Sequence, residues 1–152
     1  MKSDSRQEND KMSEKRRAAL KFGKIGEMMA TRYLSEKGYQ ILEHNYCRGH
    51  LEIDIIALDN NELVIVEVKS RNNEAVIHPE DAVGHKKRQA LIRLANEYVI
   101  SHNRKENVRF DIITVISPQG ADAATPVEAL FGDGAQGVEI KHLKDAYNVM
   151  SF

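Results

Sequence analysis

The sequence predicts an α/β fold in which helices flank a central mixed β-sheet. A helical stripe of apolar residues begins at Phe22, β-branched runs occupy residues 51–58, 63–68 and 109–116, and a second helical stripe separates the last two runs. The order is therefore helix, strand, strand, strand, helix, strand. Short turns make the first three strands an antiparallel meander, and the second helix lets the next strand return in parallel.

The first helix is predicted from Phe22 to Gly38. Its apolar residues recur with the 3.6-residue period, and Gly38 is the residue type that often ends a helix. Gly23 and Gly26 lower helix propensity, so we expect both to permit close approach to the sheet. Glu27 lies at the flank of the stripe and can lean toward the sheet, although an acid in a first turn is commonly a dipole partner.

A hairpin at the centre of the sequence organises the predicted sheet. Residues 51–58 and 63–68 are separated by the turn-forming residues Asp59, Asn60 and Asn61. A weaker strand, about 39–46, precedes the hairpin. The turn length fixes which side chains of the two hairpin strands can meet.

Charged residues lie at alternate positions of this hairpin. Since residues two apart on a strand share a face, Glu52 and Asp54 point to one side of the first strand. By the same rule Glu67, Lys69 and Arg71 share one side of the second strand. Two acids and an amine are therefore expected to gather at one surface of the hairpin.

The rest of the chain supplies a second helix and a small appendix. The helix is predicted over 79–101, and Lys87 is the only charged residue in its apolar stripe, where it either extends past the core edge or delivers its amine to the sheet edge. Residues 117–137 read as a long mobile loop, 138–141 as a short edge strand and 143–150 as a terminal helix.

Length and composition predict one domain, residues 18–152, preceded by a charged arm, residues 1–17. The arm mixes both signs of charge with polar residues and offers little to bury, so it is expected to be disordered or a frayed helix. Lys15, Arg16 and Arg17 could contact phosphates, but a solvated tail is the simpler interpretation.

The charge and cysteine content exclude several classes of protein. With 22 basic and 23 acidic residues, the chain is not a diffusely basic nucleic-acid binder, although a local basic patch remains compatible. Its single cysteine, Cys47, cannot form an internal disulfide, which suits a reducing compartment. No apolar run reaches membrane-spanning length, so we expect a cytoplasmic protein without membrane contact.

The hairpin acids predict a divalent-metal site. Asp54 and Glu67 would supply the one or two carboxylates with which proteins commonly hold Mg²⁺ or Mn²⁺, and Glu27 would add a third. Lys69 could orient an attacking water or neutralise developing charge. A Glu-x-Lys pair is often only a surface ion pair, but charges on a central apolar strand are costly unless they serve a function.

Several short segments also match a known pattern in their order and spacing. They are residues 23–27, 52–57, 66–69 and 109–111, together with Lys87. The sequence resembles the restriction-endonuclease-like, or PD-(D/E)xK, nuclease superfamily. It resembles more closely the YraN-type (UPF0102-like) family of small bacterial proteins, which is related to archaeal Holliday-junction resolvases.

The resemblance implies a restriction-endonuclease-like core and a metal-dependent nuclease that acts on DNA, including branched or processed structures. It implies Asp54 and Glu67 as metal ligands, Lys69 as the catalytic lysine and Glu27 as the acidic residue contributed by the helix. The two-fold symmetry of junction substrates favours a homodimer.

Two other functions are compatible with the sequence. The fold could grip nucleic acid without cutting it, through a basic rim formed by Arg48, Arg71, Lys86, Lys87 and Arg93. Alternatively, the sheet edge could dock a protein partner, and the carboxylates would then be vestigial. The complete set of Glu27, Asp54, Glu67 and Lys69 favours the nuclease, because a vestigial site is expected to have lost at least one member.

Overall fold

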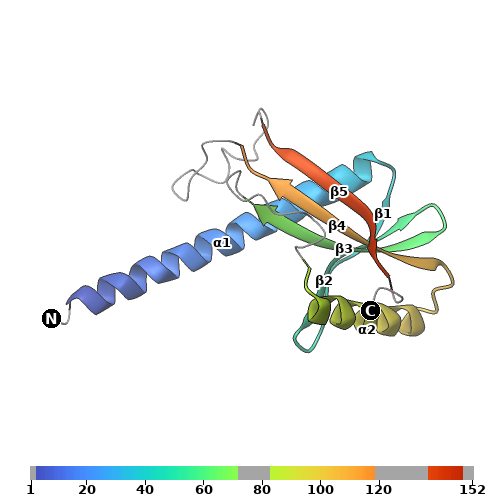
Figure 1. The fold of residues 1–152 in the computed structure, drawn as a ribbon, viewed down its shortest axis with the longest axis horizontal. Helices are drawn as coiled ribbons and strands as arrows, with labels where there is room; N and C mark the ends of the chain where they lie inside the picture. Colours follow the sequence, from blue (N-terminus) through green and yellow to red (C-terminus); the bar gives the residue numbers. More distant parts are fainter. Residues whose placement is uncertain (1–2, 72–82, 119–136, 149–152) are drawn as a thin grey trace.

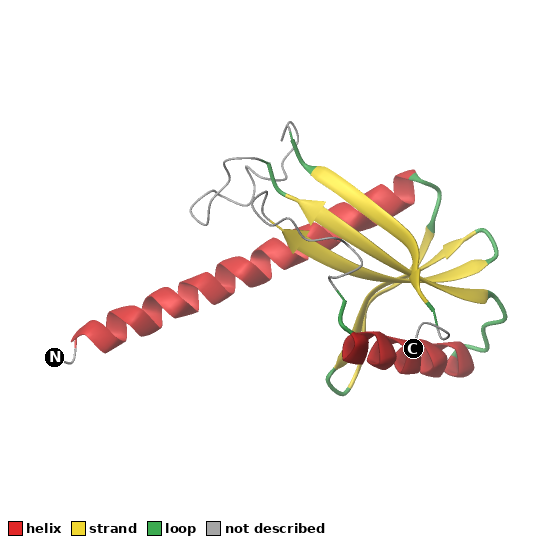
Figure 2. Ribbon diagram, in the orientation of Figure 1, coloured by secondary structure: helices red, strands yellow, loops and turns green. Residues whose placement is uncertain are grey.

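The structure, a computed structural model, describes residues 3–71, 83–118 and 137–148 of the chain. Within these ranges it contains two helices and five strands (Figures 1 and 2). The elements are, in order, α1 (Ser3–Glu36), β1 (Gln40–Arg48), β2 (Leu51–Asp59), β3 (Glu62–Arg71), α2 (His85–Ser101), β4 (Asn107–Ile116) and β5 (Glu139–Tyr147).

The five strands form one mixed sheet in the order β1-β2-β3-β4-β5. The pairs β1–β2 and β2–β3 are antiparallel, β3–β4 is parallel, and β4–β5 is antiparallel. The parallel pair is joined through α2, as a crossover connection requires. The predicted α/β class, with a mixed sheet between helices, is confirmed.

Each helix packs on its own face of the sheet. Alternate residues of β3 face opposite ways, so Val64 and Val66 join the cluster around Ala30 of α1. Leu63 and Ile65 join the cluster around Leu94 of α2. The central strands are therefore apolar on both faces, which makes each charged residue on them conspicuous.

Gly26 allows α1 to pack closely against β3. A β-carbon at Gly26 would lie 1.8 Å from Ser70 Oγ and 3.1 Å from Ser70 Cβ on β3. The prediction for Gly23 is wrong, because a β-carbon there would meet no atom within 4 Å. Gly38 follows the helix with a φ of 91°, which is the left-handed conformation expected of the residue that ends it.

A buried polar network on the α1 side ties the sheet together. Arg109 donates from Nε to Asp111 Oδ1 and from Nη2 to Asp111 Oδ2, both at 2.9 Å, and from Nη1 to Asp59 Oδ2 at 2.9 Å. His142 Nε2 lies 2.7 Å from Asp111 Oδ2, and Tyr39 Oη accepts from Arg109 at 2.8 Å. The buried charges are thus paired, as their desolvation requires.

The second helix begins later than the sequence predicted. It starts at His85, with Gly84 in an extended conformation as its N-cap, whereas the prediction placed the start at Pro79, which is outside the described residues. Val83 and Gly84 are not helical, so the predicted start is wrong. The predicted end at Ser101 is confirmed.

The predicted terminal helix over 143–150 is wrong, because the chain forms strand β5 as far as Tyr147. Leu143 and Tyr147 have helical spacing, but the open edge of β4 offers backbone hydrogen bonds, and Tyr147 stacks on Phe110 with ring centroids 5.0 Å apart. Tertiary pairing has overridden the local pattern. The remainder of that prediction, residues 149–150, lies outside the described residues.

The other expectations concern the two ends of the domain. From Ser3 onward the charged arm is helical and forms the first turns of α1, where the described side chains of residues 5–17 are all exposed. The boundary between arm and domain stays a prediction.

Most of the predicted loop, residues 119–136, lies outside the described residues. Neither of the two described helices has the length and apolarity needed to cross a membrane.

Candidate functional site

The site begins where β2 separates from β3. The two strands pair from Asp59 with Glu62 as far as Ile55 with Val66. Beyond this pair, the backbone N–H of Val68 donates to the side chain of Asp54, at 2.8 Å from its Oδ2. The carboxylate of Asp54 therefore sits in the fork between the strands, and β3 holds it in place.

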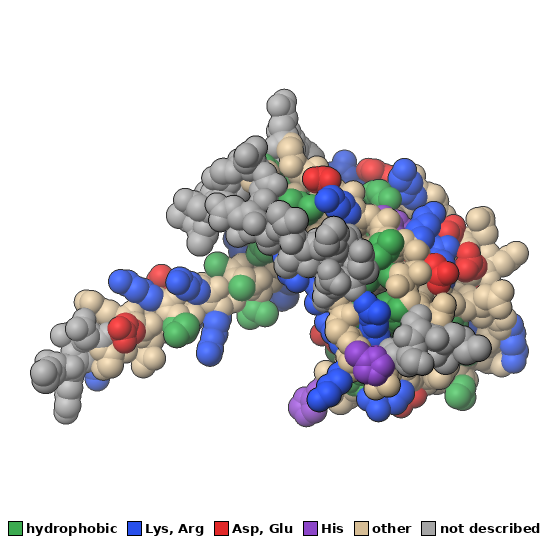
Figure 3. Space-filling view, viewed as in Figure 1, with side chains coloured by type: hydrophobic (Ala, Val, Ile, Leu, Met, Phe, Trp, Pro, Cys, Tyr) green, Lys and Arg blue, Asp and Glu red, His purple; other side chains and the backbone are tan. Residues whose placement is uncertain are grey.

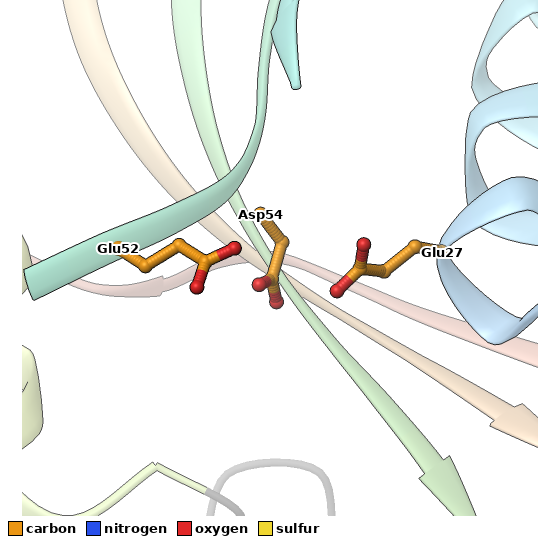
Figure 4. Close-up of side chains that lie close together, drawn as sticks. All are labelled: Glu27, Glu52 and Asp54. Atoms are coloured by element: carbon orange, nitrogen blue, oxygen red, sulfur yellow. The ribbon is translucent and has the colours of Figure 1, made fainter. Parts of the chain in front are cut away.

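Three carboxylates converge at this fork. Glu27 from α1 and Glu52 from β2 point toward Asp54 from opposite sides (Figure 4). One ligand oxygen from each of the three residues lies within 4.8 Å of the other two. Because hard divalent cations prefer oxygen ligands, this cluster has the right donors for Mg²⁺ or Mn²⁺.

Asn45 of β1 braces the cluster. With its amide oriented as the neighbouring atoms require, Nδ2 donates to Glu27 Oε2 at 3.1 Å and to Glu52 Oε1 at 2.7 Å. Its φ of 50° is left-handed, a conformation that asparagine tolerates better than most residues. Asn45 thus fixes the separation between Glu27 and Glu52. Its own strand, β1, contributes no carboxylate to the cluster.

Glu67 forms the second half of the site, with two lysines. Its carboxylate is buried, and Oε1 lies 3.1 Å from Lys69 Nζ and also pairs with Lys87 Nζ from α2. Lys87 therefore delivers its amine to the sheet, the second of the two roles considered from the sequence. The site therefore has two halves. One is the acidic cluster around Asp54, and the other is Glu67 with two amines.

Burial, together with the crowding of the acids, raises the pKa values of Asp54 and Glu27. Burial, followed by the charge of Glu67, raises the pKa of Asp54 to about 8. Burial and the charges of Glu52 and Glu67 also raise the pKa of Glu27. The charge of Glu67 thus raises the pKa of both Glu27 and Asp54. A cation bound among these carboxylates would relieve the repulsion.

The two lysines respond in opposite directions. Burial lowers the pKa of Lys69, and the positive charge of Lys87 lowers it further, against the opposing effect of Glu67. Burial alone would lower the pKa of Lys87, but its hydrogen bond to Glu67 raises it overall. Lys69 is therefore the amine that gives up a proton more readily.

A cleft leads to the carboxylates from the side of α1. It has a volume of about 860 Å³, within the range of small-ligand sites. Leu20, Lys24 and Met28 of α1 line one wall, and Asn45 of β1 lies across from them. Glu27 and Glu52 also line the cleft, so these two acids are accessible from solvent.

The residues predicted for the site divide into two groups. Glu27 and Asp54 lie in the carboxylate cluster, whereas Glu67 and Lys69 lie in the half rich in amines. Of the predicted basic rim, Lys87 is engaged with Glu67, and Arg71 donates to its neighbour's carbonyl, Ser70 O, at 2.9 Å. The other three rim residues, Arg48, Lys86 and Arg93, are exposed.

Two residues of the site were missed in the sequence. The sequence places Glu52 on the same side of its strand as Asp54, and this spacing of two residues is the signal that indicates a ligand there. Asn45 had no assigned role, since its contacts depend on a left-handed backbone in the middle of a strand. Only the three-dimensional pairing reveals that residue's position.

The order of elements is a helix, three antiparallel strands, a crossover helix and a parallel strand, and acids lie at the fork of the central hairpin. This arrangement is a restriction-endonuclease-like α/β core. Residues 26–115 match the family described as "Uncharacterised protein family UPF0102". The chain belongs to this family.

Curated relatives share this family name. A UPF0102 protein of Bacteroides thetaiotaomicron is 48% identical over 99 residues, which are 65% of this chain and 82% of the relative. A UPF0102 protein of Chlorobium chlorochromatii is 39% identical over 130 residues, which are 86% of this chain and 93% of the relative. The similarity therefore extends across most of each relative.

Proposed function

We propose that the chain is a divalent-metal-dependent nuclease that hydrolyses phosphodiester bonds in DNA. The observation that supports this most directly is the convergence of Glu27, Glu52 and Asp54 beside the amines paired with Glu67. Both halves suit a phosphodiester substrate. The acids would hold a cation that stabilises charge on the phosphate, and the amines would offset negative charge on the reacting group.

In this proposal Glu27, Glu52 and Asp54 hold Mg²⁺ or Mn²⁺, with Glu67 as a further ligand. When bound, the cation would polarise a phosphoryl oxygen and lower the pKa of a water molecule. The bond from Val68 N–H fixes the orientation of Asp54, and Asn45 fixes Glu27 and Glu52. The ligands are therefore positioned before any cation arrives.

Lys69 is proposed as the catalytic lysine. Its amine lies 3.1 Å from Glu67 Oε1, and its side chain is 19% exposed, compared with 46% for Lys87. A partly buried amine whose pKa is lowered gives up a proton more readily than an ordinary lysine, which favours a role in proton transfer. Lys87 would position Glu67 and thereby act through it.

The proposed substrate is DNA with a branched or processed structure, recognised through its backbone. Exposed Arg48, Lys86 and Arg93 would contact phosphates at the rim. A homodimer would match the two-fold symmetry of a junction. Light scattering of the purified protein with and without a four-way junction tests the dimer.

The nuclease proposal is tested by incubating the protein with plasmid, single-stranded and four-way-junction DNA in Mg²⁺ or Mn²⁺. Asp54→Asn and Lys69→Met should lose activity, whereas Glu97→Gln, an exposed acid on α2, serves as a matched control. We expect cutting by the wild type and the control, a rate lowered by about 10²-fold or more in each site variant, and no cutting with chelator.

Cutting that persists at the wild-type rate in both site variants would mean that the activity does not arise from this site. If no DNA is cut under any condition but DNA binding weakens steeply with salt, the non-catalytic binding module is supported instead.

A further inference from the structure

The N-terminal part of α1 carries a concentration of positive charge. Residues 11–24 contain six basic residues and a single acid, Glu14, whereas the whole chain has 22 basic and 23 acidic residues. The basic residues, all exposed, are Lys11, Lys15, Arg16, Arg17, Lys21 and Lys24. We call residues 11–24 the basic arm.

The basic arm leads away from the folded core. Figure 1 shows α1 lying across the sheet with its C-terminal half and projecting beyond it with its N-terminal half. Figure 3 shows lysine and arginine side chains along the projecting part. The family match begins at residue 26, so the arm precedes the matched core.

Helix geometry aligns the arm with the carboxylate cluster. Arg16, Leu20 and Lys24 precede Glu27 by eleven, seven and three residues, spacings that return to nearly the same face of a helix. Leu20, Lys24 and Glu27 all line the cleft at the site. A polyanion that follows this face would reach the acids directly.

The dimensions fit a nucleic-acid backbone. At about 1.5 Å per residue the arm is ~20 Å long, which corresponds to about six nucleotides of one strand of a duplex. Its exposed basic side chains could neutralise phosphates over that length. The phosphates at the acidic site itself would be met by the bound cation and the lysines.

An anionic membrane is the other polyanion that a basic helix can bind. Such a helix needs a continuous apolar stripe opposite its charges. The exposed large apolar residues of α1 are Met12, Leu20 and Met28, and each step of eight residues moves ~80° around the axis. They do not form a stripe, so the observations favour nucleic acid.

We infer that the basic arm binds the phosphate backbone of the nucleic acid next to the position held at the carboxylate cluster. The inference deepens the proposed function and rests on it, since it takes the same substrate class. It extends the proposed contact surface from the basic rim to a helix outside the family core.

Binding is measured by fluorescence anisotropy with a labelled duplex in the presence of chelator, so that cleavage plays no part. The test variant is Arg16→Gln/Arg17→Gln, which keeps good helix formers. The matched control is Lys105→Gln/Lys141→Gln, two exposed lysines outside the arm. Circular dichroism should show equal helix content in all three proteins.

We expect the dissociation constant of the test variant to rise about tenfold at low salt. The slope of its logarithm against log salt should fall by about 1.8, because two phosphate contacts with the duplex are lost. The control should behave like the wild type.

Equal weakening in test and control variants would overturn the inference, because the effect would then follow net charge alone. Binding of the wild type to anionic phosphatidylserine vesicles with loss in the test variant, and unchanged DNA binding, would also overturn it. If the test variant binds and cuts like the wild type, the arm assignment fails while the nuclease stands. If nothing is cut but the test variant binds more weakly, the arm stands without catalysis.

Discussion

Asp54 is the residue on which the site depends. It sits in the fork between β2 and β3, accepts the N–H of Val68 and faces Glu27 and Glu52. Keeping such a group ionised without a cation costs stability, as is common at functional sites. The structure therefore ties function at Asp54 to a measurable penalty in the metal-free protein.

Replacing Asp54 by asparagine is expected to stabilise the metal-free protein at pH 8. Because folding raises the pKa of Asp54 from 3.8 to about 8, its favourable contribution is fully present below pH 4 and is lost as the pH rises toward 8. Asp54→Asn lacks this loss and can still accept the Val68 N–H. We expect a gain of about 2 kcal/mol or more, and thus about 4 °C or more in Tm, at pH 8, since each unit of pKa shift corresponds to about 1.4 kcal/mol.

Thermal unfolding in chelator at pH 4 and pH 8 measures this effect. At pH 4 the gain should disappear, because the wild-type carboxyl group is largely protonated in the folded state. Asp10→Asn, an exposed acid on α1, is the control and should change little. A destabilised Asp54→Asn at pH 8 would show that the acid is not strained in the fold.

The two lysines of the site should differ in their effect on cleavage. Lys69→Met is expected to lower the rate by about 10²-fold or more, the usual effect of losing a proton-transfer or charge-stabilising group. Lys87→Met should lower it by roughly tenfold, because its more exposed amine acts by positioning Glu67. Single-turnover rates in Mn²⁺ compare the two. If Lys87→Met lowers the cleavage rate more than Lys69→Met does, Lys87 would be the catalytic lysine and Lys69 the positioning residue.

At the scale of residues the sequence was informative where the alternation of strands could be followed. It placed Glu52 and Asp54 on one side of β2, and both lie in the cluster. It expected Asp54, Glu67 and Lys69 to gather at one surface of the hairpin. Instead the regular pairing ends at Ile55, and that local fork cannot be derived from periodicity.

At the scale of elements, α1 approaches β3 at one glycine. Gly26→Ala should destabilise the protein by about 1 to 3 kcal/mol, since the new methyl group would overlap Ser70 Oγ. Gly23→Ala is the matched control and should stabilise it by about 0.5 to 1 kcal/mol, because its β-carbon meets nothing and alanine favours helix. Urea denaturation measures both.

Adding Ser70→Ala to Gly26→Ala should restore part of the loss, because it removes the nearest atom. If Gly26→Ala were as stable as Gly23→Ala, the close packing of α1 on the sheet would be incorrect, and with it the delivery of Glu27.

The sequence predicted elements well where local pattern and tertiary pairing agree. The hairpin turn is one case, since Asn60 adopts the left-handed φ of 53° that its residue type suggests. The last element is the opposite case. Leu143 and Tyr147 suggested a helix, but the edge of β4 recruited them into β5. A partner strand distant in sequence cannot be inferred from a local window.

At the scale of the whole molecule, the network around Asp111 joins residues from across the sheet. Asp111 is fully buried and receives hydrogen bonds from Arg109 and from the backbone N–H of Asp145. Asp111→Ala should destabilise the protein by roughly 3 to 5 kcal/mol, because it leaves the guanidinium of Arg109 buried without its main partner.

Urea denaturation of Asp111→Ala, with Asp10→Ala as an exposed control, measures that loss. Because the hydrogen bonds of Asp111 run to Arg109, His142 and Asp145 and not to the carboxylate cluster, this substitution should leave metal affinity per folded molecule unchanged. A change below about 1 kcal/mol would mean that the network contributes little more than a surface pair.

The whole arrangement places acids from α1 and β2 in one cluster, amines from β3 and α2 beside it, and a basic helix leading toward it. In the proposed function, Glu27, Glu52 and Asp54 hold a divalent cation. Calorimetric titration of Mn²⁺ into the full chain tests this most directly.

We expect one site in the wild type, with affinity lower at pH 6 than at pH 8 by about tenfold or more, because Asp54 must lose its proton to bind the cation. Asp54→Asn and Glu27→Gln should abolish binding, and Glu97→Gln should preserve it. No binding by the wild type at pH 8, or equal binding by Asp54→Asn, would contradict the account.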